Sequence, residues 1–250
     1  MHVPFHMSSA FKFTSSETLG LILDNKTLRF TRADAFNDIY ELSPFIVPLD
    51  WVEITELAKT NFAAAKHLSI VAFQRICSSL YISCFSRSYT APESQLMWAH
   101  YGNHHKGVCI EVDFDFLRRL DPSSRYCPVA VTYVDSLLEE RNRRSPTSED
   151  LPLFIATYKG KVWAYEDEVR VVIETESFDK SRFTVSSDKR AIDVAFDARA
   201  IRKVIFGLKC DPAEIHKIVC GFLDAGHTPQ YVKLDIDPLT LAAVEKPIPT

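Results

Sequence analysis

Acidic and basic side chains alternate along one short segment of the chain. In an extended strand over Glu166 to Ile173, alternation would place Glu166, Glu168 and Arg170 on one face and apolar side chains on the other. Val172 continues the charged face, which indicates a partly covered cleft. Two carboxylates beside a guanidinium could orient a sugar hydroxyl, stabilise a cationic transition state or bind a metal ion. The alternative is a solvated edge strand carrying a surface Glu–Arg pair of little energetic weight.

A second group of chemically capable residues lies between Gln95 and Gly107. Trp98 and Tyr101 could stack on a flat ring, while His105 and Lys106 could donate to a phosphate. The three histidines of this segment suggest zinc, but a Gly-Asn pair interrupts the helix that would align them, so no metal ligand is assigned. The alternative is a packed aromatic corner with exposed histidines.

A third segment, Phe36 to Glu41, reads Phe-Asn-Asp-Ile-Tyr-Glu. Asn and Asp side chains commonly bond to nearby backbone in turns, so we expect a turn here. A structural role and a functional role both remain open for it.

Hydrophobic periodicity predicts the elements that must position these residues. Many neighbouring strands are separated by short turns and lack a crossover helix, which favours an α+β fold with a mixed sheet. We expect a single domain over residues 1–250, with a helical insertion at about 52–80 and an exposed, charged loop at about 139–150. Strands are predicted at Phe11–Phe13, Thr27–Thr31, Tyr81–Ser86, Gly107–Val112, Cys127–Val134, Glu166–Ile173, Ala191–Phe196, Lys203–Phe206 and Gln230–Leu234. Helices are predicted from Ser16 to Leu23 with Ser15 or Ser16 as the cap, from Gln95 to Tyr101, from Phe114 to Leu120 after an Asp113 cap, from Leu151 to Lys161, and to Leu223 after an Asp211 cap.

Composition narrows the class of protein. With 46% hydrophobic residues in 250, the chain can bury a core, which excludes a disordered or fibrous protein. A formal charge of −4 provides no overall field for nucleic acid or an anionic membrane, and no apolar run approaches the roughly 20 residues of a membrane-spanning helix. The six cysteines stand singly, as in a protein of a reducing cytoplasm. Glycine motifs for Rossmann and P-loop nucleotide binding are absent.

Four motifs in order resemble the bacterial family filed as domain of unknown function 2971. They are F-N-D-x-[FY]-E, then S/C-F-S, then M-W-x-x-Y-G-x-x-H-K-G, then K-x-x-x-W-x-Y-E-x-E-x-R. The resemblance runs from about Phe11 to about Gly207. The usual Pro of the first motif is Ile39 here. The family name implies no activity.

A weaker resemblance is to the ADP-ribosyltransferase fold, in which a mixed, largely antiparallel split sheet with flanking helices holds NAD in a cleft. That superfamily places His or Arg on an early strand, an aromatic residue or Ser on a middle strand and Glu on a late strand. Here Lys12 stands on the early strand, Ser86 on the middle strand and Glu168 on the late strand. Lysine lacks the planar fork of arginine, so the early position departs from the pattern.

The second resemblance implies an NAD-dependent ADP-ribosyltransferase or NAD glycohydrolase, such as a bacterial toxin or phage-defence component. Glu168 would stand beside the ribose, Arg170 would hold it, and Glu166 would steer the ribose or the acceptor. Trp98 or Tyr101 would stack on a ring. The implied contacts to the rest of the nucleotide are Lys12, Ser86, His105 and Lys106.

Two further classes of function stay open. One is a non-catalytic module that binds a nucleotide or a protein on the same face. The other is a metal-dependent nuclease that uses Glu166, Glu168 and a histidine. For an enzyme, the acceptor could be protein, nucleic acid or water. The sequence does not indicate an oligomeric state.

Overall fold

The computed structural model describes residues 7–36, 56–57, 59–90, 94–120, 128–144, 150–176 and 178–249. Within these ranges the chain has the predicted α+β class, with a mixed, largely antiparallel open sheet. The helices are α1 (Ser16–Asn25), α3 (Phe62–Ser79), α4 (Ser94–His100), α5 (Phe114–Arg119), α6 (Leu137–Arg144), α7 (Leu151–Thr157) and α8 (Pro212–Asp224). Short 3-10 helices are η1 (Ala33–Ala35), η3 (Lys161–Glu166), η4 (Lys180–Arg182) and η5 (Ala198–Ala200). The strands are β1 (Ser9–Thr14), β2 (Thr27–Arg32), β3 (Leu80–Ser86), β4 (Val108–Asp113), β5 (Val129–Ala130), β6 (Thr132–Val134), β7 (Tyr158–Gly160), β8 (Glu168–Glu174), β9 (Phe183–Val185), β10 (Ala191–Ala195), β11 (Ile201–Phe206), β12 (Gln230–Ile236) and β13 (Ala243–Pro247).

Strand β3 is the centre of the main sheet, which has the order β13-β12-β11-β4-β1-β3-β2-β10-β9. β8 pairs with β3 along its whole length, from Ser86 opposite Glu168 to Leu80 opposite Glu174. β1 pairs with one end of β3, at Ser86. β2 pairs with the other end of the same strand, at Tyr81 and Ile82. The sheet therefore divides at β3 into two limbs. Among the described strands of this sheet, only β11 and β12 run parallel.

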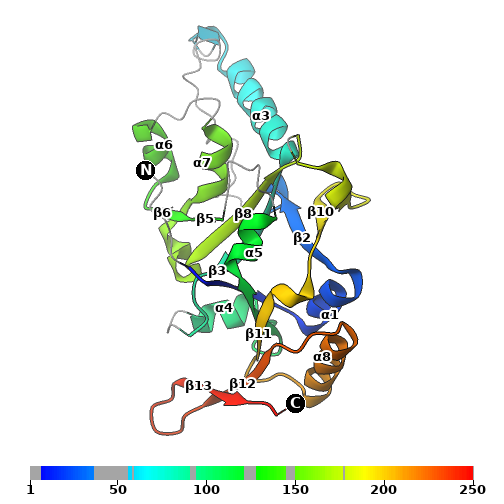
Figure 1. Ribbon diagram of the computed structural model, residues 1–250. Helices are drawn as coiled ribbons and strands as arrows, with labels where there is room; N and C mark the ends of the chain where they lie inside the picture. Colours follow the sequence, from blue (N-terminus) through cyan, green and yellow to red (C-terminus); the bar gives the residue numbers. More distant parts are fainter. Residues whose placement is uncertain are drawn as a thin grey trace.

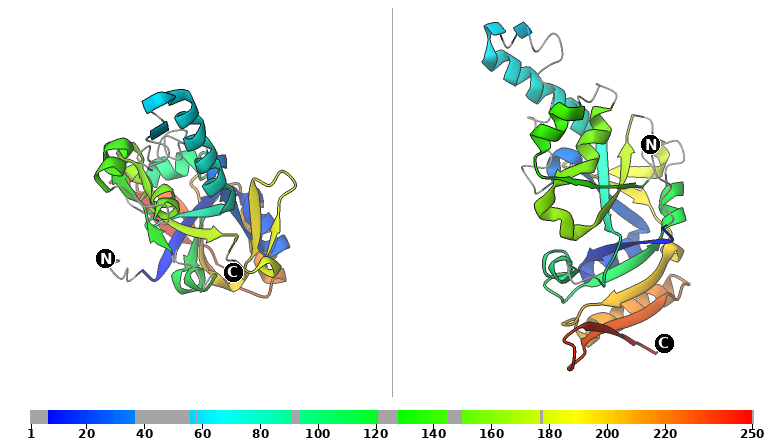
Figure 2. Two further views of the ribbon diagram at one scale, coloured as in Figure 1. Left: turned by 90° about the horizontal axis from the view of Figure 1, so that it is seen from above. Right: turned by 90° about the vertical axis from the view of Figure 1, so that its left-hand side faces the viewer.

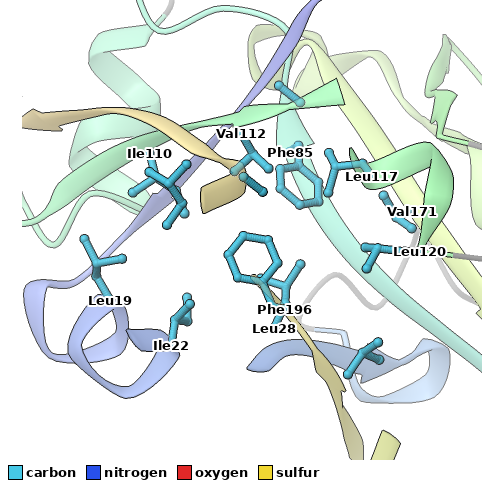
Figure 3. Close-up of a cluster of buried hydrophobic side chains, with 14 of the residues drawn as sticks. Leu19, Ile22, Leu28, Phe85, Ile110, Val112, Leu117, Leu120, Val171 and Phe196 are labelled. Atoms are coloured by element: carbon cyan, nitrogen blue, oxygen red, sulfur yellow. The ribbon is translucent and has the colours of Figure 1, made fainter. Parts of the chain in front are cut away.

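Both faces of β8 are buried. Val169, Val171 and Ile173 belong to the main hydrophobic cluster, part of which Figure 3 shows, while Val172 belongs to a second cluster beneath α3 and α7. β8 also lies between β3 and β5. The alternative of a solvated edge strand is therefore wrong, because its charged face is covered as well.

Capping side chains fix where several helices begin. Ser15 accepts a hydrogen bond from the Thr18 N–H at 3.1 Å, so α1 begins at the serine pair expected to cap it. Asp113 and Asp211 cap α5 and α8 in the same way, as predicted. α1 and α8 lie side by side on one limb of the sheet (Figure 1).

Other elements differ from the sequence-based prediction. The helix expected to run to Lys161 ends at Thr157, because Tyr158–Gly160 pairs with Thr132–Val134 in a separate two-stranded sheet. The single strand expected from Cys127 is two short strands that join different sheets, and Cys127 itself lies outside the described residues. The charged segment at 139–150 begins within α6.

The predicted helical insertion contains α3, which projects away from the sheet (Figures 1 and 2). β13 was not predicted, since its five residues Ala-Val-Glu-Lys-Pro show no alternation of apolar and polar side chains and are mostly exposed. None of the described helices combines the length and the hydropathy needed to cross a bilayer.

Candidate functional site

A hollow opens where the middle of β1 and the ends of β3 and β8 meet α4 and η3; we call it the β3–β8 hollow. Its volume is about 150 Å³. An engineered protein cavity of roughly this size holds benzene, so the hollow is large enough for one ring of a nucleotide and too small for a whole dinucleotide. Aromatic side chains and charged groups share its wall. It is lined by Phe11, Lys12, Phe13, Phe36, Cys84, Phe85, Ser86, Met97, Tyr101, Lys159, Glu166 and Glu168.

The two glutamates reach the hollow from different elements. Glu166 is the last residue of η3 and Glu168 the first of β8, so the prediction that both stand on one strand is wrong. Asp167, between them, has the left-handed conformation with φ of 44°, which Asp tolerates better than most residues. Arg87 fixes this turn through an ion pair with Asp167 and a backbone hydrogen bond of 2.9 Å to its carbonyl. The two carboxylates therefore come together through this turn and not through alternation along one strand.

Glu168 is held by Arg170 in a two-pronged ion pair. Arg170 Nε and Nη2 donate to the two carboxylate oxygens, each at 2.9 Å, and Nη1 donates to the Ala156 carbonyl at 2.9 Å. Both side chains are buried. Burial alone raises the pKa of Glu168, but the adjacent guanidinium more than offsets this and brings the pKa to about 2. Glu168 is therefore a fixed anion at neutral pH.

Lys159 links the two glutamates, and its role was not predicted. Its Nζ donates to Glu166 Oε2 and, at 3.3 Å, to Glu168 Oε2. The ammonium also lies 5.1 Å from the centre of the Trp163 ring. Lys159 is the first residue of the K-x-x-x-W motif, so the sequence did contain a signal for it.

The pKa of Glu166 shifts upward, in the opposite direction to the pKa of Glu168. The Tyr101 hydroxyl donates to Glu166 Oε1 at 2.7 Å, and the side chain is buried. Burial raises the pKa of Glu166, and Lys159 only partly opposes the rise. Two neighbouring carboxyls whose pKa values are driven apart are suited to different tasks, one as a permanent charge and one as a proton carrier.

Lys12 and Ser86 also line the hollow, as the predicted site requires. Lys12 Nζ donates to Ser83 Oγ at 3.2 Å and to the Cys84 carbonyl at 3.1 Å, and it lies 5.1 Å from the centre of the Phe85 ring. Burial lowers the pKa of this lysine. Ser86 Oγ donates to a carbonyl two residues on at 2.7 Å.

Four predicted site residues do not line the hollow: Arg170, which lies behind Glu168, and Trp98, His105 and Lys106. The Trp98 ring packs edge-on against Phe13 at 5.0 Å in a third apolar cluster, so it serves the core. His105 lies in the turn after α4, where its N–H bonds to the Trp98 carbonyl at 3.1 Å. Lys106 is exposed in the same turn. The segment from Trp98 to Lys106 is therefore the packed aromatic corner that the sequence offered as an alternative. Tyr101 differs from Trp98, His105 and Lys106 because it lines the hollow.

Only the first residue of the Phe36–Glu41 segment is described. Phe36 lines the hollow, and its ring centre lies 5.6 Å from the Arg170 guanidinium carbon. The predicted turn at residues 37–41 lies outside the described residues. In the part of the chain that is described, no group of three or more His, Cys, Asp or Glu side chains could hold a metal ion.

A known protein family shares part of the sequence that forms the hollow. Residues 97–171 match the model of the family described as Protein of unknown function (DUF2971). This confirms the predicted resemblance to that family over the segment that holds the third and fourth motifs. The DUF2971 segment contains Lys159 and both glutamates, which are three of the four charged residues that line the hollow, together with Tyr101 and Arg170. No curated protein and no solved structure matches the chain.

Proposed function

We propose that this protein cleaves the bond between nicotinamide and ribose in NAD and passes ADP-ribose to an acceptor or to water, in the manner of an ADP-ribosyltransferase or NAD glycohydrolase. The supporting observation is a fixed carboxylate, Glu168, beside a protonatable one, Glu166, in the wall of a hollow that fits one ring. Such an activity would suit a bacterial toxin or a phage-defence component.

The proposed chemistry depends on charge. As the bond to nicotinamide lengthens, positive charge develops on the ribose, and a carboxylate beside the sugar lowers the barrier. Glu168 remains ionised because Arg170 binds both of its oxygens, so it needs no reorganisation during the reaction. Arg170 acts through Glu168 and is a positioning residue.

Other lining residues have complementary tasks in this proposal. The ring would lie in the hollow against Tyr101 and Phe85, and Glu166 would accept a hydrogen bond from a ribose hydroxyl or the acceptor. Lys12 would donate to the diphosphate. The adenosine half of NAD would extend outside the hollow, because the volume admits one ring only.

Incubation of the purified protein with NAD, with chromatographic detection of free nicotinamide, tests the proposal. We expect nicotinamide release, and a decrease of about 100-fold or more in Glu168→Gln, since removal of one group that stabilises transition-state charge typically costs about 10²–10³. Glu140→Gln, which changes an ion pair on α6 that does not line the hollow, is the matched control and should keep full activity.

Thermal unfolding followed by circular dichroism would show whether both variants are folded. If Glu168→Gln does not fold, the wild-type protein still decides the matter. Failure of folded wild-type protein to release nicotinamide from NAD would refute the proposal.

One observation favours a second candidate, a module that binds a nucleotide without converting it. Both oxygens of Glu168 already accept hydrogen bonds, from Arg170 and Lys159, which neutralises much of its charge toward a sugar. This candidate predicts that NAD raises the melting temperature while no nicotinamide forms. The metal-dependent nuclease gains no such support, because no histidine is among the described residues that line the hollow.

A further inference from the structure

A row of aromatic rings continues from the wall of the hollow onto neighbouring residues. The His100 ring centre lies 6.2 Å from that of Tyr101, which lines the hollow. The Tyr165 ring centre lies 5.9 Å from that of His100 and 6.0 Å from that of Trp163. We call His100, Tyr165 and Trp163, which do not line the hollow, the aromatic strip.

The other end of the strip also adjoins the hollow. The Trp163 ring centre lies 5.1 Å from the Nζ atom of Lys159, and Lys159 is part of the wall. Helix α4, which ends at His100, packs against η3, which carries Trp163 and Tyr165. Two elements in contact therefore hold the strip next to the charged wall.

Packing of the core does not account for the strip. Trp163 belongs to none of the apolar clusters found in the described part of the chain, and Tyr165 packs only partly against the third cluster. Both residues are half-buried, and His100 is exposed. His100 Nδ1 and the Tyr165 hydroxyl form a hydrogen bond of 3.0 Å, which holds these two rings in one arrangement. Partly exposed rings that are already held in place lose little freedom when a flat ligand stacks on them.

NAD contains a second flat ring for which the hollow has no room. The hollow admits one ring, and the proposed reaction assigns it to the nicotinamide end, so adenine must lie outside. Any nucleobase has a π face that can stack on an aromatic side chain. We propose that the aromatic strip binds the adenine ring of NAD, with Trp163 as the main stacking surface. This inference rests on the proposed function, because it places adenine relative to the nicotinamide ribose beside Glu168.

Isothermal titration calorimetry with ADP-ribose tests the adenine site without requiring catalysis, because this ligand carries adenine but no nicotinamide. We expect the Kd of Trp163→Ala to be about tenfold higher than that of the wild type, which is within the range for one stack of a base on an aromatic ring. Trp163→Phe keeps an aromatic face and should recover most of the affinity. Phe62→Ala, which removes a 66% exposed aromatic side chain from α3, is the matched control and should bind like the wild type.

Nicotinamide release from NAD and from nicotinamide mononucleotide, which lacks adenine, provides the second measurement. Trp163→Ala should raise the KM for NAD about tenfold while its kcat stays unchanged, because adenine takes no part in breaking the bond. The KM for nicotinamide mononucleotide should not change. If Trp163→Ala does not fold, Tyr165→Ala takes its place in both measurements.

The outcomes separate this inference from the proposed function. If the wild type does not bind ADP-ribose, or if the folded strip variant binds it equally well, the adenine site is refuted, and nicotinamide release decides the NAD proposal independently. An equal rise in KM for both substrates also overturns the adenine site, since it would show that Trp163 acts on the hollow through Lys159. Weaker binding of ADP-ribose to the strip variant, with no nicotinamide released by folded wild type, supports the adenine site and refutes the cleavage of NAD.

Discussion

Two arginine–carboxylate pairs in the same sheet have nearly identical geometry and very different surroundings. Arg170 binds both oxygens of Glu168 at 2.9 Å, and Arg29 on β2 binds both oxygens of Asp193 on β10 at 2.8 and 2.9 Å. The side chains of the first pair are 0% and 5% exposed, and those of the second are 65% and 24% exposed. Burial is the main difference between the two pairs.

Burial changes what such a pair contributes. At the surface, water screens the attraction, and the pair adds little to stability. In the interior, the attraction between the two charges is strong, but the cost of removing both charges from water cancels most of it. A buried pair is therefore weak evidence of stabilisation. The Arg170–Glu168 pair is therefore better explained by the position of Glu168 in the wall of the hollow, where Arg170 keeps this carboxylate ionised and fixed.

The largest expected effect comes from removing one partner of each pair. Arg170→Met leaves Glu168 buried without its main counter-charge, and we expect it to lower the free energy of unfolding by about 3–5 kcal/mol. Arg29→Met is the matched control and should cost about 0.2–1 kcal/mol. Urea unfolding at neutral pH measures both. Similar losses in the two variants would contradict the idea that burial separates the pairs.

A smaller effect should appear on acidification. The pKa of Glu168 lies at about 2 in the folded protein, below its ordinary value of 4.5, so its contribution is complete above pH 4.5 and is lost as the pH falls toward 2. We expect this loss to approach about 3 kcal/mol. Comparison of the wild type with Glu168→Gln isolates it, because other carboxyls titrate in both. The stability difference between them should shrink across this range; a constant difference would show that Glu168 is not selectively stabilised as an anion.

Local patterns in the sequence were enough to predict much of this region. Alternating residue types correctly placed Glu168 and Arg170 on one strand face, and Ser15 and Asp113 marked helix starts. These features depend on the period of a strand or on one capping side chain. Such information is contained within a few neighbouring residues.

Features that depend on tertiary contacts were missed. Lys159 faces the glutamates because β7 pairs with β6, and nothing local distinguishes β7 from a continuing helix. Trp98 turns into the core because Phe13 lies behind α4, and a seven-residue helix carries too short a pattern to show which face meets the sheet. Pattern alone therefore identified the charged motif but not its full set of partners.

The smallest expected effect concerns salt, and it tests the same comparison without changing the pH. The Debye length falls from about 10 Å at 0.1 M to about 3 Å at 1 M salt, which screens exposed charges far more than buried ones. We expect the cost of Arg29→Met to disappear at 1 M NaCl, while the cost of Arg170→Met stays the same within error. Each cost is the difference between wild type and variant in urea at the same salt concentration, so general salt effects on folding cancel. If salt reduced the cost of Arg170→Met as well, water would have to reach the Glu168 carboxylate, and the hollow would provide a weaker field for any cation-forming reaction than the proposed chemistry requires.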